Sequence, residues 1–311
     1  MSERLKLSVS PHIHGGRSTS RIMLDVLIAL LPATIAGTVI FGLRALLVVA
    51  VCVASCMMFE FLFNLIRKKE QTVTDLSAAV TGLILALNLP AEIPLWQCVV
   101  GSLFAIVVVK CIFGGIGCNV VNPAIAARVF MLVSFGSMVA VTKPVIVELE
   151  SGATPLVQIQ NGNAPSILDS FLGLTGGTIG ETCALALLIG FVYLLVRKVI
   201  TWHIPVSIIA TVFVFSFFAE GFDVLGALSL ILSGGLMLGS IFMATDYVTS
   251  PTTPWGKLIF GVGIGLITCL IRYFGSYPEG MSFAILFMNI LVPYIDKCTR
   301  RKIFGEGGAR V

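Results

Sequence analysis

Residues 45–66 read ALLVVAVCVASCMMFEFLFNLI, and this stretch decides the class of fold. It contains one charged side chain, Glu60, and as an α-helix rising about 1.5 Å per residue it is long enough to cross the hydrocarbon core of a bilayer, about 30 Å thick. Similar runs recur along most of the chain. Of the 311 residues, 57% are hydrophobic and 12% are charged, against roughly 25% charged in soluble domains. Together with a mean hydropathy of +1.02, this composition indicates a membrane protein with many spans.

The apolar runs form two groups of five on either side of a more polar stretch, residues 143–180. The third run is shorter than the roughly 20 residues of a straight span, and Asn88 and Pro90 stand at its end, so we expect it to be broken there. We predict an all-α polytopic membrane protein with about ten transmembrane helices, at residues 22–41, 45–66, 76–90, 95–113, 123–142, 181–196, 201–218, 224–243, 257–275 and 280–296.

Basic residues predict the orientation, because Lys and Arg in short loops stay on the cytoplasmic side. One predicted face holds most of them, whereas the opposite loops are mainly acidic, with Glu92, Glu220 and Asp223. We therefore expect a multi-pass protein of a bacterial inner membrane with both termini cytoplasmic and no nucleic-acid partner. The predicted units are a cytoplasmic arm (1–21), a first five-helix repeat (22–142), an outside loop (143–180), a second five-helix repeat (181–296) and a cytoplasmic tail (297–311).

The two groups of spans resemble each other weakly. Residues 81–85, TGLIL, are echoed by residues 234–238, GGLML, and in each half a proline, a tryptophan and another span follow. Chance recurrence of Gly and Leu explains so short a match equally well. If the match is real, five spans per half invert the second copy, and such inverted repeats place a site at their interface near the membrane midplane.

Several short motifs occur in a characteristic order. They are SPHIH at 10–14, FGGIG at 113–117, NPA at 122–124, SGAT at 151–154, GET at 180–182 and ATDYVTSP at 244–251. Alone, the SGAT motif before Pro155 is typical of a surface loop. In this order the motifs resemble, nearly end to end, one family of membrane flavoproteins: the D subunits of Rnf-type ferredoxin:NAD oxidoreductases and the similar B subunits of sodium-pumping NADH:quinone reductases.

In the family that the chain resembles, a flavin transferase attaches FMN through its phosphate to the threonine of the SGAT motif. The resemblance therefore implies a covalent phosphoester on Thr154, with Ser151, Gly152 and Ala153 completing the motif. These residue types suit the bond, because a phosphoester needs a hydroxyl, Gly152 lets the backbone approach a phosphate, and Ala153 adds no bulk. Glu148 stands where the transferase motif has Asp, which preserves the charge.

The resemblance also implies a second, noncovalent flavin, riboflavin, among the spans on the cytoplasmic side. Two glycine-rich or polar runs lie there, residues 113–122 and 244–253, and Thr249, Ser250 and Thr252 are the candidate hydrogen-bonding residues for this flavin. For most glycines of these runs, close helix packing is the favoured interpretation.

Acidic residues in or beside the spans predict ion handling, because a carboxylate in lipid costs at least about 2.5 kcal/mol. Asp246 and Glu60 are the predicted ion-coupling residues. The alternative for Glu60 is an ion pair with Lys110 or Arg128, and the alternative for Asp246 is a solvated position in its loop. The histidines and scattered cysteines lack the number and spacing of metal ligands, so no metal site is predicted and Fe–S clusters are expected only in partner subunits.

The leading hypothesis is an electron-transfer subunit of an ion-translocating (Na⁺ or H⁺) ferredoxin:NAD oxidoreductase complex, with no complete reaction of its own. The partners implied by the resemblance are other membrane and peripheral subunits, among them a second FMN-bearing subunit and Fe–S subunits, besides the flavin transferase. One alternative is a secondary transporter or channel of the inverted-repeat type without flavin, and another is a purely structural scaffold. The motif at 151–154 favours the first hypothesis, because a solute transporter has no need for it.

Overall fold

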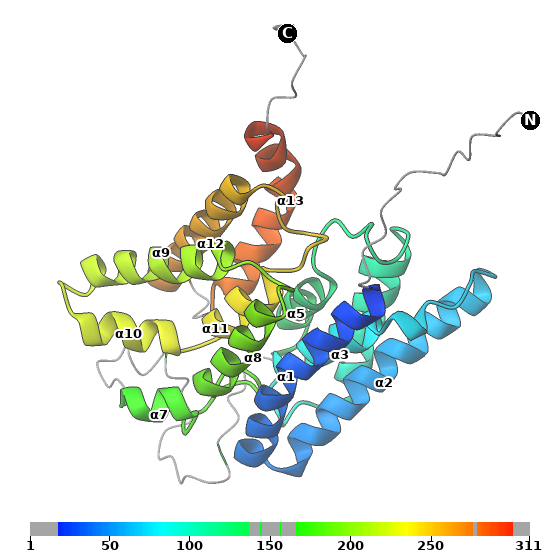
Figure 1. Cartoon of the computed structure of the whole chain (residues 1–311). Helices are drawn as coiled ribbons and strands as arrows, with labels where there is room; N and C mark the ends of the chain where they lie inside the picture. Colours follow the sequence, from blue (N-terminus) through cyan, green and yellow to red (C-terminus); the bar gives the residue numbers. More distant parts are fainter. Residues whose placement is uncertain (1–17, 137–143, 145–155, 157–165, 276–278, 301–311) are drawn as a thin grey trace, which may run out of the picture.

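The computed structural model describes residues 18–136, 144, 156, 166–275 and 279–300. All regular elements in this part of the chain are helices (Figure 1). Four described helices are long and apolar enough to cross a membrane, and the bent pair formed by α10 and the segment after it is a fifth when counted as one span. These helices are α1 (Thr19–Phe41), α2 (Leu43–Ile66), α12 (Pro254–Phe274), α13 (Met281–Thr299) and α10 (Val224–Leu232) with α11 (Leu236–Leu238) and η4 (Gly239–Met243). The prediction of an all-α membrane protein with several spans is confirmed.

Shorter apolar helices occupy the remaining predicted runs within the described ranges. They are α3 (Ser77–Leu87), α4 (Leu95–Leu103) continued by the π-helical η2 (Phe104–Cys111), α5 (Pro123–Ser134), α8 (Ala184–Val196) and α9 (His203–Ala219). The short elements η1 (Val73–Asp75) and α7 (Ile167–Leu172) lie in the connections. In Figure 1 the start of α1 and the end of α13 point to the upper side, and α7 lies at the lower side.

Helix ends follow from local chemistry in two places, Asn122 and Asn88. Asn122 caps α5, because its Oδ1 accepts from the N–H groups of Ala124 and Ile125 at 3.0 and 3.4 Å, and Pro123 takes the first helical position. The third apolar run does break where expected, since α3 ends at Leu87 and Asn88 donates back to the carbonyl of Ile84 at 2.6 Å.

Thr178 and Glu181 have the sequence spacing of a capping box, which predicts that a helix begins at this point, and this prediction is wrong. Helix α8 begins at Ala184, and Thr178 instead donates its hydroxyl to the carbonyl of Leu87 at 3.2 Å. The carboxylate of Glu181 binds Arg128, because a buried guanidinium without a partner is far more costly than an uncapped helix end.

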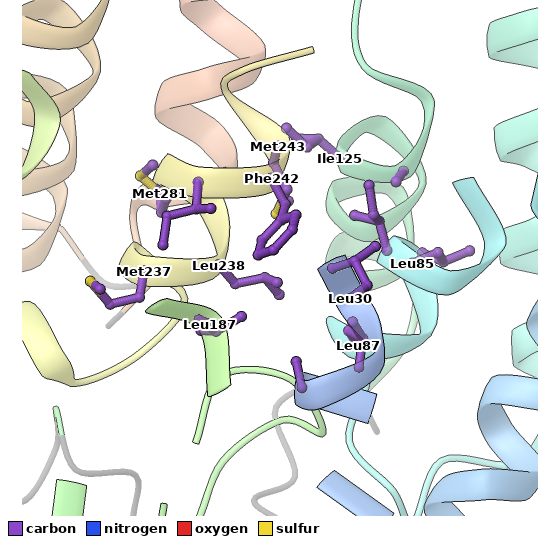
Figure 2. Close-up of a cluster of buried hydrophobic side chains, with 14 of the residues drawn as sticks. Leu30, Leu85, Leu87, Ile125, Leu187, Met237, Leu238, Phe242, Met243 and Met281 are labelled. Carbon is purple, nitrogen blue, oxygen red and sulfur yellow. The ribbon is translucent and has the colours of Figure 1, made fainter. Parts of the chain in front are cut away.

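Apolar side chains from both groups of helices meet in one core. Figure 2 shows them converging from α1, α3, α5, α8, α11, η4 and α13. Ten of these side chains, none more than 5% exposed, are Leu30, Leu85, Leu87, Ile125, Leu187, Met237, Leu238, Phe242, Met243 and Met281. The outer faces of the same bundle expose large apolar side chains, such as Ile66 and Phe274 at 78% and 80%, as expected for surfaces that face lipid.

Helices α1 and α8 touch through their backbones. A Cβ atom added to Gly190 of α8 would overlap the carbonyl oxygen of Ala29 in α1 and come within 2.8 Å of the Phe242 ring. Only glycine fits this position, as is common where membrane helices approach closely. The contact joins the first group of helices to the second, directly beside η4.

Candidate functional site

A cavity lies between the two groups of helices, with about 90 Å³ of space for the centres of water-sized particles. We call it the main cavity. Its walls come from α1, α3, η2, α8 and η4, from the loop before α5 and from the loop after η4, and they are mostly apolar. The polar or charged lining residues are Ser77, Thr81, Lys110, Asn119, Asn122, Thr245, Asp246 and Tyr247. Largely apolar walls with a few convergent polar groups are typical of cofactor sites.

Asn119 brings an unused hydrogen-bond acceptor to the main cavity. Its Oδ1 is buried and has no hydrogen-bond partner among the described residues. The neighbouring Asn122 is fully engaged, since it caps α5 and donates its Nδ2 to the carbonyl of Met243 at 3.2 Å. A buried acceptor left without a donor costs about 1–3 kcal/mol, so this position suits a ligand that carries an N–H or O–H group.

The loop that carries Asn119 owes its shape to three glycines. Gly114, Gly115 and Gly117 have φ values of +123°, +97° and +90°, in a region that L side chains rarely adopt. A Cβ atom at Gly115 or Gly117 would meet nothing within 4 Å. The predicted role in helix packing is therefore wrong for Gly115 and Gly117. These glycines instead allow the positive φ values of the loop.

Lys110, on the π-helical η2, lines the main cavity and is paired with Glu60. Its Nζ lies 2.9 Å from Glu60 Oε1 and 2.6 Å from Ser77 Oγ. Thr72 donates its hydroxyl to the same oxygen of Glu60 at 2.8 Å. The ion pair with Lys110, which was the alternative for Glu60, is thus present in the structure. The second carboxylate oxygen of Glu60, Oε2, is buried without a partner in the described part of the chain. A role of Glu60 in ion coupling stays a prediction.

Asp246 lies in the loop after η4, at the wall of the main cavity. It accepts hydrogen bonds from the Thr249 hydroxyl at 3.1 Å and from the Val248 N–H at 3.5 Å. Burial raises the pKa of Asp246 above its usual range, although these two hydrogen bonds oppose the shift. Burial likewise raises the pKa of the neighbouring Tyr247 to about 12.

None of the three residues suggested for the second flavin is among the described lining residues of the main cavity. The Thr249 hydroxyl is taken by Asp246, and Ser250 is buried. Thr252 binds the Asp296 carboxylate, which accepts from its N–H at 3.1 Å. Asn119 lines the cavity and was not predicted from the sequence, although it lies in the glycine-rich run at residues 113–122.

A second polar centre surrounds Arg128 of α5. This guanidinium donates to Asn88 Oδ1 at 2.6 Å and to Glu181 Oε1 at 2.8 Å, and the same nitrogen, Nη2, also contacts Glu279 Oε2. Arg128 and Glu181 are buried, whereas the Glu279 side chain is 22% exposed. The sequence gives one warning of this centre, because Arg128 stands inside an apolar run, where a charge needs a partner.

The break between α10 and α11 lies beside this centre, and the helix axes bend there by 68°. Arg272 of α12 donates to the carbonyl oxygens of Leu230 and Ser233, at 2.7 and 3.2 Å, and so caps the open end of α10. A Cβ atom on Gly235 would lie 2.6 Å from Glu181 Oε1 and 3.2 Å from Arg128 Nη1. The break is therefore shaped around charged groups.

Residues 151–154, with the predicted attachment site Thr154, lie outside the described residues. Leu156, two positions further on, is described and buried. Its Cδ1 would lie 2.7 Å from a Cβ atom on Gly234, so Leu156 packs directly on the break between α10 and α11. Within the described ranges, no three His, Cys, Asp or Glu side chains are grouped so that they could hold a metal ion.

Comparisons with known proteins place the chain in a family. The model of the NQR2, RnfD, RnfE family matches residues 6–305. The chain is 47% identical over 307 residues to the D subunit of the Na⁺-translocating ferredoxin:NAD⁺ oxidoreductase complex of Acetobacterium woodii, covering 97% of the chain and 95% of that protein. It is 36% identical over 316 residues to the D subunit of the proton-translocating ferredoxin:NAD⁺ oxidoreductase complex of Clostridium ljungdahlii, covering 96% of each.

A further relative is the D subunit of the ion-translocating oxidoreductase complex of Stutzerimonas stutzeri. The two proteins are 37% identical over 328 residues, and the matched region covers 93% of each. All three relatives are named as subunits of redox enzyme complexes that translocate ions. Because the family model covers nearly the whole length, the resemblance read from the order of the motifs is confirmed. The chain belongs to the NQR2, RnfD, RnfE family.

Proposed function

We propose that this chain is the D-type electron-transfer subunit of an ion-translocating ferredoxin:NAD⁺ oxidoreductase complex, with FMN bound covalently to Thr154. The observation that carries the proposal is the 47% identity, over nearly the full length of both proteins, to the D subunit of such a complex. The SGAT motif at 151–154 adds the hydroxyl that a phosphoester needs. The chain works as part of the complex, and partner subunits supply the ferredoxin and NAD⁺ chemistry.

The proposed topology has ten spans in two inverted five-helix repeats, with both termini cytoplasmic. In support, each of the ten predicted runs overlaps with one long, bent or shorter apolar helix of the described ranges. In each group the third unit is interrupted, at Asn88 in the first and at residues 233–235 in the second. The start of α1 and the end of α13 lie on one side in Figure 1, as an even number of spans requires.

We assign the second, noncovalent flavin to the main cavity. The fit rests on the buried and unpaired Oδ1 of Asn119, because this oxygen can accept a hydrogen bond from the imide N–H of the flavin ring. The Tyr247 hydroxyl offers a donor for a ring carbonyl, and Phe242 offers an apolar wall. When bound, a flavin at this position supplies one-electron transfer, and the protein supplies its position and electrostatics.

The ion-coupling residues of the proposal border the same cavity. Asp246 lines it directly, and Glu60 reaches it through Lys110. A negative charge that arrives in a cavity with apolar walls raises the affinity of nearby carboxylates for a cation, because water screens the charge poorly there. Asp246 and Glu60 are therefore placed where electron arrival favours cation uptake.

The deciding experiment is flavin fluorescence on a denaturing gel. The complex is produced in a host that supplies the flavin transferase, as the parent chain and as Thr154→Ala, with Thr142→Ala as a control threonine outside the motif. We expect fluorescence that survives denaturation in the parent and in the control, and a dark band for Thr154→Ala. A dark parent band would remove covalent FMN from the proposal and favour a transporter or scaffold.

A further inference from the structure

A second, smaller cavity lies at the break between α10 and α11, and we call it the break cavity. It is lined by Thr175, Gly176, Gly177, Glu181, Thr182, Leu232, Ser233, Gly234 and Glu279. Its free space admits roughly one water-sized particle. Two carboxylates of sequence-distant segments thus face one small space beside an interrupted membrane helix.

These two carboxylates are close to each other as well as to Arg128. Glu181 and Glu279 both contact the same guanidinium nitrogen, Nη2 of Arg128. Because these two oxygens contact one nitrogen atom, the carboxyl groups are near neighbours. Two ionised carboxylates that lie close together in a buried site repel each other strongly, because little water screens their charges. A proton or a cation between them is therefore favoured.

Thr182 gives an independent sign that the break cavity holds a ligand. The residue is 5% exposed and lines the cavity. Its Oγ1 is buried and has no hydrogen-bond partner in the part of the chain that the structure describes. A hydroxyl oxygen in this position is an expected ligand for an alkali cation or an acceptor for a protonated water.

We propose that the break cavity binds one monovalent cation, Na⁺ or a proton carried by water, through the carboxylates of Glu181 and Glu279 and the hydroxyl of Thr182. A divalent ion is disfavoured, because the Arg128 guanidinium contacts both carboxylates and the space admits only a small particle. The inference rests on the proposed ion-translocating function and deepens it, by naming an ion site separate from Asp246 and Glu60.

One short segment connects the break cavity to the main cavity. Leu232, Ser233 and Gly234 line the break cavity, and Phe242 and Asp246, a few residues later, line the main cavity. A side chain on Gly235 would collide with the Glu181 carboxylate, so occupancy of the break cavity acts directly on the backbone of this segment. Cation binding at the break is thereby coupled to the wall of the proposed riboflavin site.

The test uses the purified whole complex carrying the parent chain, Thr182→Val, Glu279→Gln or the control Ser170→Ala. Ser170 is another buried hydroxyl without a described partner, and it lies outside the break cavity. The sodium concentration that gives half-maximal thermal stabilisation is measured at fixed pH, and proton release on alkaline titration is measured without sodium. Flavin fluorescence on denaturing gels, run in parallel, reports the proposed function separately.

For a sodium site, we expect Thr182→Val and Glu279→Gln to raise the half-maximal sodium concentration by about tenfold or more, with Ser170→Ala unchanged. For a proton site, sodium has no effect, and Glu279→Gln abolishes the release of one proton on alkaline titration. Unchanged sodium response and unchanged proton release in both variants, with flavin fluorescence intact, would overturn the inference. If the complex with Glu279→Gln fails to assemble, proton release is measured on Glu181→Gln instead. The sodium response is then decided by Thr182→Val, which leaves the Arg128 contacts in place.

Discussion

Lys110 and Glu60 form an ion pair 2.9 Å long in which each side chain is only 2% exposed. The two residues come from η2 and α2. Lys110 also contacts the Ser77 hydroxyl, and Glu60 Oε1 accepts from the Thr72 hydroxyl. A buried pair of this kind is weak evidence for stability, because desolvation of both charges offsets their attraction. The pair borders the main cavity, where we propose that Glu60 takes part in ion coupling.

Breaking this pair from one side is expected to destabilise the protein. Lys110→Met leaves the Glu60 carboxylate buried without its cation, and the expected loss is about 3–5 kcal/mol. The double variant Glu60→Gln with Lys110→Met removes both charges and should recover much of the loss. Thermal unfolding of the detergent-solubilised complex measures the three stabilities, and a Lys110→Met variant as stable as the parent would contradict the pairing.

The backbone contact between α1 and α8 predicts a sharp difference between two glycines. Gly190→Ala forces a methyl group into the carbonyl of Ala29, so a destabilisation of about 1–3 kcal/mol is expected from overpacking. Gly136→Ala is the matched control, because a Cβ atom there would meet nothing within 4 Å. The two variants are compared by thermal unfolding, and equal stability would argue against the close approach.

Asn119 is predicted to retain the noncovalent flavin. Asn119→Leu removes the unpaired acceptor from the main cavity, and we expect the affinity for riboflavin to fall about tenfold. Riboflavin is quantified by chromatography after denaturation, beside Asn163→Ala as a control asparagine elsewhere in the chain. Covalent fluorescence at Thr154 should not change. Full riboflavin retention in Asn119→Leu would remove this residue from the proposed site.

Stability is predicted to fall as the pH rises through the range in which Glu181 titrates. Glu181 lies in the connection before α8, which begins at Ala184 and not at residue 181 as predicted. Burial together with the Glu279 carboxylate raises the pKa of Glu181 to about 8, although Arg128 opposes the shift. Between the usual value of 4.5 and about 8, the folded protein holds a proton that the unfolded chain has released. The folded state is therefore favoured at the acidic end of this window and loses that advantage towards pH 8.

Sodium-free melting temperatures from about pH 5 to pH 8 check this prediction. Glu181→Gln should flatten the slope, because the amide does not titrate. The charged groups that face Glu181 are Arg128 from α5, Glu279 before α13 and Arg272 from α12. Ser170→Ala leaves all of them unchanged and should keep the parent slope. An equally steep slope in Glu181→Gln would assign the titration to another group.

Much of the helical framework was predictable because its signals are local. Hydropathy located the apolar runs, the order Asn122 then Pro123 located the start of α5, and the polar Asn88 marked the interruption after α3. The family could be read from motifs in order. Each of these signals depends on residues that are neighbours in the sequence or on their order along it.

The contacts of the two polar centres were mostly not predictable, because they join residues that are far apart in the sequence. Glu60 meets Lys110 across 50 positions, and Arg128 meets Glu279 across 151. Glu181 was misassigned to a helix cap because its local spacing fits that motif equally well. Asn119 was overlooked, since an unpaired amide becomes visible only when its surroundings are known. The attachment site at Thr154 stays a prediction from the motif.

The cap that Arg272 places on α10 has a consequence for membrane leakage. The carbonyl groups of an interrupted helix attract mobile cations, and a row of such groups offers them a conducting path. At this interruption the positive charge is tethered to the protein, so it cannot be exchanged with the solution. We expect this tethered charge to keep cations from passing along the interrupted helix, so that an ion gradient is not dissipated there.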